Sequence, residues 1–255
     1  MLTPPLPPSE LILDHRIHAI PLSEALSCIL GGFDEAHDDP MTVAFLNATS
    51  IDHGLREDEV SSALADLDLA LPDGVSIVLA SRILRGQIRF RYSGIDLLKL
   101  CLDLEGRTHF FFGSQSATLE RIAGRIERDF PHARQVGHFA PPMWPWDPSI
   151  DDEVLDHIAE VKPDFLWVGL TAPKQELWLA RHRRRIQARV GIAVGYAFDT
   201  LAGTRQLAPD WIRRCGLEWF YRLLQDPRRI WRRVVVQSPS FLLKVLATRL
   251  RDLSP

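Results

Sequence analysis

The chain has 255 residues, of which 46% are apolar and 25% are charged, and this composition excludes a disordered or fibrous chain and allows a core of its own. The net charge is only −3, but it is unevenly spread. Residues 210–255 hold ten Arg and Lys against four Asp and Glu (+6), whereas residues 1–209 hold 20 against 29 (−9). The basic end predicts an anionic partner.

The cysteines and the apolar runs narrow the class of protein further. Cys28, Cys101 and Cys215 are widely spaced, with no CxxC and no neighbouring His pattern, so we expect reduced cysteines rather than a disulfide framework or a zinc site. No signal-peptide segment opens the chain, and no apolar run approaches the roughly 20 residues of a spanning helix. We expect a cytoplasmic protein that meets a membrane only from its surface.

In chain order, strands and helices are expected to alternate. Residues 1–10 are Pro-rich and expected to be flexible, and residues 11–20 form a first β segment. The pattern then predicts strands at 42–47, 108–112, 135–138, 165–170 and 190–194, and helices at 23–30, 48–67, 93–102, 117–128, 151–161 and 174–187. Such alternation is typical of an α/β fold, here a Rossmann-like parallel sheet flanked by helices over residues 11–205.

The best-defined strand-to-helix junction lies at residues 163–179. Its apolar run, 165–170, is typical of a strand buried on both faces, and Pro173 suits the first turn of a helix. Lys174, Gln175 and Glu176 then follow the carboxyl end of a strand, where open α/β sheets bind ligands and helix N–H groups favour anions. The alternative is a capped, solvated helix start.

A second candidate lies in Pro72-Asp73-Gly74, between apolar segments at 69–71 and 75–80 whose type we leave unassigned. Because Asp73 stands between two turn formers, it has a purely structural alternative as a turn residue.

The amino-acid composition changes after Gly203. Helices are predicted at 211–214, 217–224, 227–236 and 241–250, with Trp, Phe and Leu interleaved with arginines, so residues 206–255 form a basic, amphipathic helical appendage. This composition favours a place at a lipid headgroup layer. The alternative is that the segment packs on the body and its arginines are a solvated face.

Several of these segments together resemble the WecG/TagA/CpsF family of bacterial glycosyltransferases. The resemblance spans about residues 42–233 and rests on the segments 72–74 (PDG), 91–97 (RYSGIDL), 168–176 (VGLTAPKQE), 194–199 (VGYAFD), 202–203 (AG), 208–211 (APDW), 216–222 (GLEWFYR) and 226–233 (DPRRIWRR). It is their shared order and spacing that make the resemblance specific.

The resemblance implies an inverting, metal-independent transferase without a cofactor. It would take a sugar from a UDP-sugar and add it to an undecaprenyl-diphosphate-linked saccharide, for cell-wall, capsule or exopolysaccharide synthesis. The enzyme would be peripheral on the inner face of the cell membrane, held to anionic lipid by its C-terminal tail. A homo-oligomer is left open.

The resemblance also assigns site residues. Asp73 matches the family's proposed general base, although its charge would equally stabilise an oxocarbenium-like sugar. The arginines that the family folds over the active site are matched by Arg222, Arg229 and Arg232, whose guanidinium groups suit diphosphate oxygens. The remaining substrate-binding positions are Gln175 and Asp199, expected at the uridine or sugar of the donor, and Asn47 and Arg91.

Some positions depart from the usual family pattern. Phe45 stands where many members have Thr, Thr171 replaces a Gly, Leu207 replaces an Arg, and Pro141-Pro142 replaces a Gly-Tyr pair. These changes affect the expected sugar specificity, and no residue selects the donor sugar or the acceptor saccharide.

Two other classes of function are weighed against the transferase. One is a UDP-sugar-binding module without catalysis, which the departures at Phe45 and Leu207 would suit. The other is a nucleic-acid-binding protein that uses the basic tail; the acidic body and the lack of a nucleic-acid-binding motif argue against nucleic acid as a partner.

Overall fold

A computed structural model of the chain describes residues 7–33, 39–142, 148–225, 227–231, 235 and 237–251. Its centre is one parallel sheet with the strand order β4-β3-β8-β7-β5-β6. The strands are β3 (Met41–Leu46), β4 (Leu69–Pro72), β5 (Thr108–Gly113), β6 (Arg134–Phe139), β7 (Phe165–Gly169) and β8 (Val190–Ala193). The predicted α/β fold with a Rossmann-like sheet is confirmed.

The sheet is covered on both faces, which explains why its central strands are apolar throughout. Along β7, Phe165 and Trp167 enter one core, whereas Leu166 and Val168 enter the other. The first core is completed by α1 (Leu22–Gly31), α5 (Gly94–Leu102), α6 (Ser116–Asp129) and α9 (Ala197–Leu201). The second is completed by α2 (Ala48–Gly54), α3 (Asp58–Ala65), α4 (Val75–Leu84), α7 (Pro148–Val161) and α8 (Lys174–His182).

Three local predictions from the sequence differ in detail from the structure. The segment 48–67 forms two helices, α2 and α3, rather than one. The helix predicted at 174–187 ends at His182 and continues as the 3-10 turn η1 (Arg183–Arg185). The unassigned segments beside Asp73 are strand β4 and helix α4, so Asp73 lies at a strand-to-helix junction like that of Gln175.

The first β segment is an antiparallel hairpin, β1 (Ser9–Ile12) with β2 (His15–His18). β1 begins inside the segment expected to be flexible, of which residues 1–6 lie outside the described residues. His18 is fully buried, and its Nδ1 accepts a hydrogen bond from the Ala70 N–H at 3.0 Å. Because β4 is the edge strand of the main sheet, this hydrogen bond satisfies one of its backbone N–H groups and stabilises the strand that ends directly before Asp73.

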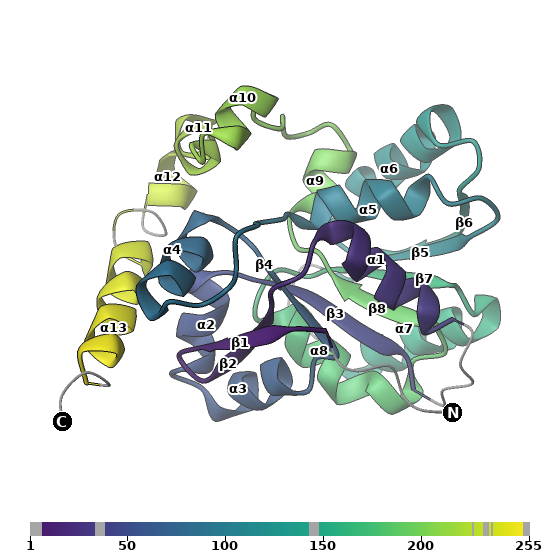
Figure 1. Cartoon of the computed structure of the whole chain (residues 1–255). Coiled ribbons are helices and arrows are strands. Elements are labelled where there is room, and N and C mark those ends of the chain that lie inside the picture. Colours follow the sequence, from purple (N-terminus) through teal and green to yellow (C-terminus); the bar gives the residue numbers. More distant parts are fainter. Residues whose placement is uncertain are drawn as a thin grey trace.

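The described residues of the C-terminal part are largely helical, as predicted, and its last helix packs on the body. Residues 232–234 and 236 of the helix predicted at 227–236 lie outside the described residues. The helices are α10 (Asp210–Arg214), α11 (Glu218–Gln225), α12 (Pro227–Trp231) and α13 (Ser238–Arg251). Figure 1 shows α13 beside α4, with α10 and α11 above them in this view. Phe241 and Val245 of α13 are fully buried in the second core, and Lys244 Nζ pairs with the Asp52 carboxylate of α2 at 2.6 Å.

The burial of α13 decides how the C-terminal part is best tested. Removing residues 206–255 would take Phe241 and Val245 out of the core as well as removing the basic residues. Single substitutions therefore separate activity from folding better than truncation does.

Candidate active site

The predicted site residues that follow strands gather at the carboxyl edge of the sheet. Asn47 follows β3, Asp73 follows β4 and Gln175 lies in the first turn of α8, which follows β7. Because β3 and β4 are parallel and Leu46 is paired with Pro72, the register places Asn47 next to Asp73. This is the edge at which open α/β sheets bind ligands.

Asn47 has two structural tasks at this edge. Its Oδ1 caps α2 by accepting from the backbone N–H groups of Thr49 (3.0 Å) and Ser50 (3.3 Å). Its Nδ2 donates to Asp73 Oδ2 at 3.1 Å. The cap fixes which end of the amide faces Asp73, so the carboxylate receives a donor rather than an acceptor.

The turn at Gly74 directs the chain from Asp73 into α4. Gly74 has φ = 86°, a backbone conformation that costs glycine little, and α4 begins at the next residue. Asp73, Val75 and Ser76 therefore lie together at a cavity, with the Asp73 carboxylate beside the Asn47 amide.

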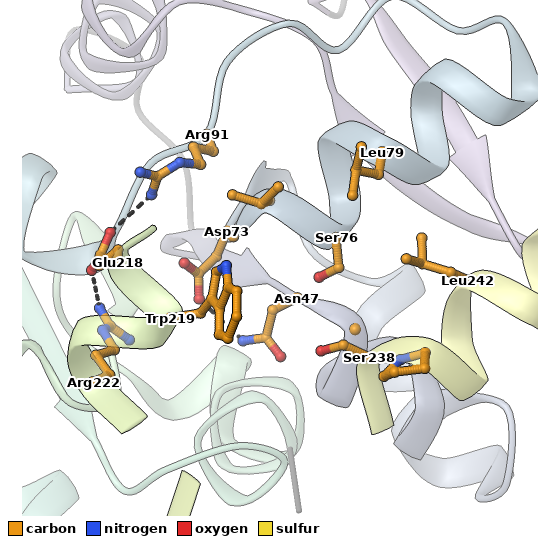
Figure 2. Close-up of a pocket in the computed structure, with 14 residues that line it drawn as sticks. Asn47, Asp73, Ser76, Leu79, Arg91, Glu218, Trp219, Arg222, Ser238 and Leu242 are labelled. Atoms are coloured by element: carbon orange, nitrogen blue, oxygen red, sulfur yellow. Dashed lines mark hydrogen bonds and ion pairs between the residues drawn. The ribbon is translucent and has the colours of Figure 1, made fainter. Parts of the chain in front are cut away.

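Arg91 and Arg222 meet at a buried carboxylate, Glu218. Glu218 is only 6% exposed; its Oε2 accepts from Arg91 Nη1 at 2.8 Å and its Oε1 from Arg222 Nη2 at 2.5 Å (Figure 2). Burial alone would raise the pKa of Glu218, but Arg222, Arg91 and Arg213 together lower it, so the group is ionised. Arg91 also donates to the Arg213 carbonyl.

Gln175 ties the loop after β7 to the end of β8. Its Oε1 accepts from the Gly195 N–H at 2.9 Å, and its Nε2 donates to Glu176 Oε1 at 2.9 Å. Glu176 is 1% exposed, and burial raises the pKa of its carboxyl despite the bond from Gln175. Gln175 therefore lines the site with its amide orientation already set by two protein partners.

Two adjoining cavities share Asn47, Asp73, Glu218 and Arg222. The cavity toward α4, α11 and α13, of about 270 Å³, is largely apolar and includes Val75, Leu79, Trp219, Pro239 and Leu242 (Figure 2). The cavity toward β7 and β8, of about 400 Å³, is more polar and includes Thr171, Gln175, Tyr196, Arg205 and Gln206. Asp73 thus lies where an apolar and a polar space meet.

Asp199 lies apart from the group around Asp73. It is in α9 and lines a third cavity, of about 410 Å³, together with Ser114, Gln115 and Thr118 near the start of α6. Its carboxylate lies 3.6 Å from Arg205 Nε, and Arg205 lines both this cavity and the polar one. Asp199 is therefore connected to the polar cavity only through its neighbours.

The other predicted arginines fall at the limits of the described structure. The backbone of Arg229 belongs to α12, but its side chain lies outside the described residues, as does all of Arg232. Their predicted contact with a diphosphate stays a prediction.

The metal prediction also stays a prediction. Within the part of the chain that the structure describes, no three His, Cys, Asp or Glu side chains gather as metal ligands do. Asp66 and Asp68 have the spacing of an Asp-x-Asp metal motif. However, Asp68 precedes β4 and lies at the amino ends of the strands, opposite to the carboxyl ends where Asp73 lies. There its carboxylate accepts from the Thr42 N–H at 2.7 Å and pairs with Arg183.

Sequence reasoning missed Glu218 and the apolar wall formed by Leu79, Trp219 and Leu242. Glu218 was inside a recognised segment, but an acid four residues before an arginine on a helix is also the pattern of an exposed ion pair. Its burial depends on Arg91, which is 127 residues away in the sequence.

Comparison with known proteins identifies the family of the chain. Residues 11–255 match the family described as the Glycosyl transferase WecG/TagA/CpsF family. The chain belongs to this family. Within the WecG/TagA/CpsF family, it is similar to two N-acetylglucosaminyldiphosphoundecaprenol N-acetyl-beta-D-mannosaminyltransferases. The protein from Bacillus spizizenii is 32% identical over 72% of this chain and 70% of its own length, and that from Bacillus subtilis (strain 168) is 28% identical over 75% and 73%.

The first prediction separates the two tasks of Asn47. Asn47→Asp keeps a good cap for α2 but replaces the donor to Asp73 with a second carboxylate, which disfavours ionisation of Asp73. We expect the acid limb of the pH–rate profile to move to higher pH and turnover to fall roughly tenfold or more, because a hydrogen bond to a charged group contributes about 1.5–3 kcal/mol. The fold should remain intact, with a melting temperature lowered by several degrees, because the lost bond also stabilises the folded chain.

Asn47→Ser is the matched control for this prediction. It also caps α2 and removes the donor to Asp73 without adding a charge, so turnover should fall and the acid limb should move to higher pH by less than in Asn47→Asp. An unmoved acid limb in Asn47→Asp would show that Asn47 does not act on Asp73.

Proposed function

We propose that this member of the family transfers a sugar from a UDP-sugar to a saccharide linked to undecaprenyl diphosphate. The observation that carries the proposal is the position of Asp73 between a polar and an apolar cavity, with Arg222 at both. A nucleotide-sugar and a lipid-linked acceptor differ in polarity in the same way as the two cavities.

The donor is assigned to the polar cavity. Its walls come from the loops after β7 and β8, with Gln175, Tyr196 and Arg205 as polar groups around a space of about 400 Å³. Arg222 lies at its border, where a guanidinium fork can hold diphosphate oxygens and stabilise the charge that grows on departing UDP. Asp199, through Arg205, is placed at the outer end of the donor, where the third cavity adjoins.

The acceptor is assigned to the apolar cavity. The two Bacillus relatives carry the name of enzymes that act on N-acetylglucosaminyldiphosphoundecaprenol, and we extend this class of acceptor to the present chain. The wall of Val75, Leu79, Trp219 and Leu242 suits the sugar faces and the start of the lipid. Transfer of N-acetylmannosamine is the first donor specificity to test.

The chemistry proposed is a single displacement with inversion. The acceptor hydroxyl oxygen attacks the anomeric carbon, the bond from that carbon to the UDP oxygen breaks, and the hydroxyl proton passes to the Asp73 carboxylate. Asn47 holds that carboxylate in place by its hydrogen bond. The charge on UDP is offset by arginines, so the reaction is proposed to need no metal or cofactor.

Docking at an anionic membrane from the cytoplasmic side completes the proposal. Among the described residues, no helix combines the length and apolarity that crossing a bilayer requires. On α11, however, the charged Glu218 is buried while Phe220 and Leu224 are 47% and 66% exposed. An amphipathic helix with its apolar side chains outward is suited to the headgroup layer, beside the lipid-linked acceptor.

The test of the activity uses Asp73→Asn. The amide keeps the shape of Asp73 and an acceptor for Asn47, but it cannot take a proton, so turnover should fall by roughly 10²–10⁴. The affinity for UDP should stay near that of wild type. The measurement is UDP release from a panel of UDP-sugars, including UDP-N-acetylmannosamine, with a lipid-diphosphate N-acetylglucosamine acceptor.

Three other results would change the conclusion. Equal loss of UDP binding in Asp73→Asn would make Asp73 structural. A wild-type protein that binds UDP but turns over no donor would favour a binding module, and salt-dependent binding to nucleic acid without binding to anionic vesicles would favour the nucleic-acid alternative.

The membrane contact is tested with the double variant Phe220→Ser and Leu224→Ser. Neither side chain lines the two cavities, so the affinity for UDP should not change. Burial of such side chains contributes about 1.5–3 kcal/mol each, so we expect partitioning onto phosphatidylglycerol-containing vesicles in a co-sedimentation assay to fall roughly tenfold or more. Leu11→Ser on β1, 63% exposed, is the matched control. Unchanged partitioning of the double variant would refute docking through α11.

A further inference from the structure

Glu218 is the charged side chain in the active site that the proposed chemistry does not use. It lies in the first turn of α11 and borders both cavities. Its two carboxylate oxygens are each bound by a guanidinium group, Arg91 from the body and Arg222 from the next turn of its own helix. Figure 2 shows the carboxylate between the two arginines.

An ion pair between residues four apart on a helix normally contributes little, because water screens it. Here the carboxylate is 6% exposed, and a buried charge is tolerated only when its partners satisfy it. The arginines more than offset the effect of burial and lower the pKa of Glu218. The negative charge is therefore permanent at neutral pH, and both arginines are held by it.

A carboxylate at this position would repel a diphosphate if it faced the ligand alone. Because Arg91 and Arg222 both pair with Glu218, the three side chains together carry a net positive charge. A guanidinium has five N–H donors in a fixed plane, so Arg222 can hold Glu218 with one edge and offer others to a second anion. The plane of Arg222 is thereby set before any ligand arrives, which removes an ordering cost from binding.

We propose that Glu218 is a positioning residue for recognition of the donor diphosphate. It acts through Arg222 and Arg91 and does not touch the substrate. The inference rests on the proposed function, because it assigns the anion that Arg222 meets to the diphosphate of the donor.

The experiment is a double-mutant cycle on Glu218 and Arg222. Glu218→Gln should lower kcat/KM for the UDP-sugar by roughly 10²-fold, the scale of a small misplacement in an active site, and should weaken UDP binding measured by calorimetry. In an Arg222→Gln background, the same change should have little further effect, because the group through which Glu218 acts is already absent.

Lys244→Gln is the matched control. Lys244 belongs to α13 and pairs with Asp52 of α2 at 2.6 Å, so it makes another ion pair between the C-terminal helices and the body, but its side chain lines neither cavity. It should leave the affinity for UDP near that of wild type. Should Glu218→Gln destabilise the fold, Glu218→Asp keeps the charge, withdraws it by one methylene and should show the same dependence on Arg222.

The outcomes separate this inference from the proposed function. An active wild-type enzyme whose Glu218 variants are unimpaired, or whose losses add to that of Arg222→Gln, overturns the positioning role alone. An equal loss in Lys244→Gln assigns the effect to general attachment of the C-terminal helices and overturns it too. A wild-type protein that neither binds UDP nor turns over UDP-sugars overturns the proposed function and this inference together.

Discussion

A carboxylate can remain ionised inside a protein only if cations satisfy it, and in this chain that requirement joins the C-terminal helices to the sheet. Glu218 of α11 is matched by Arg91 of the body, and Arg213 of α10 is matched by Asp96. Removing one partner of the buried Glu218 pair costs about 3–5 kcal/mol, whereas the more exposed Arg213–Asp96 pair contributes less. The same ion pairs that hold α11 in place also bring Arg222 to the edge of the sheet where Asp73 lies.

The exposure of α11 follows from this arrangement. Its charged residues, Glu218 and Arg222, face the body, whereas Phe220 and Leu224 remain outside. In a protein that acts only in water this would be an unfavourable surface. In a transferase whose acceptor is held by a lipid, one helix can place an arginine at the site and apolar side chains toward the membrane. One face of α11 therefore makes the electrostatic contacts with the body, and the opposite face is the one proposed to dock on the membrane.

Much of the fold could be predicted because buried parallel strands are apolar throughout, as β7 and β8 are. The position of Asp73 beside Asn47 could not, since it depends on the register of β3 against β4, which local patterns do not fix. The break between α2 and α3 was missed because the apolar pattern continues through Gly54 and Leu55. The segment that contains Phe241 and Val245 could not be placed from the sequence, because alternating apolar residues and arginines suit both packing on the body and a headgroup layer; the structure buries both side chains in the second core.

The central claim is that fixed arginines, with Arg222 among them, neutralise departing UDP in place of a divalent cation. It is tested most directly by measuring the turnover of a UDP-sugar by purified enzyme in excess EDTA and after addition of Mg²⁺ or Mn²⁺. The account predicts equal turnover under all three conditions. Turnover that disappears in EDTA and returns with either metal would contradict it.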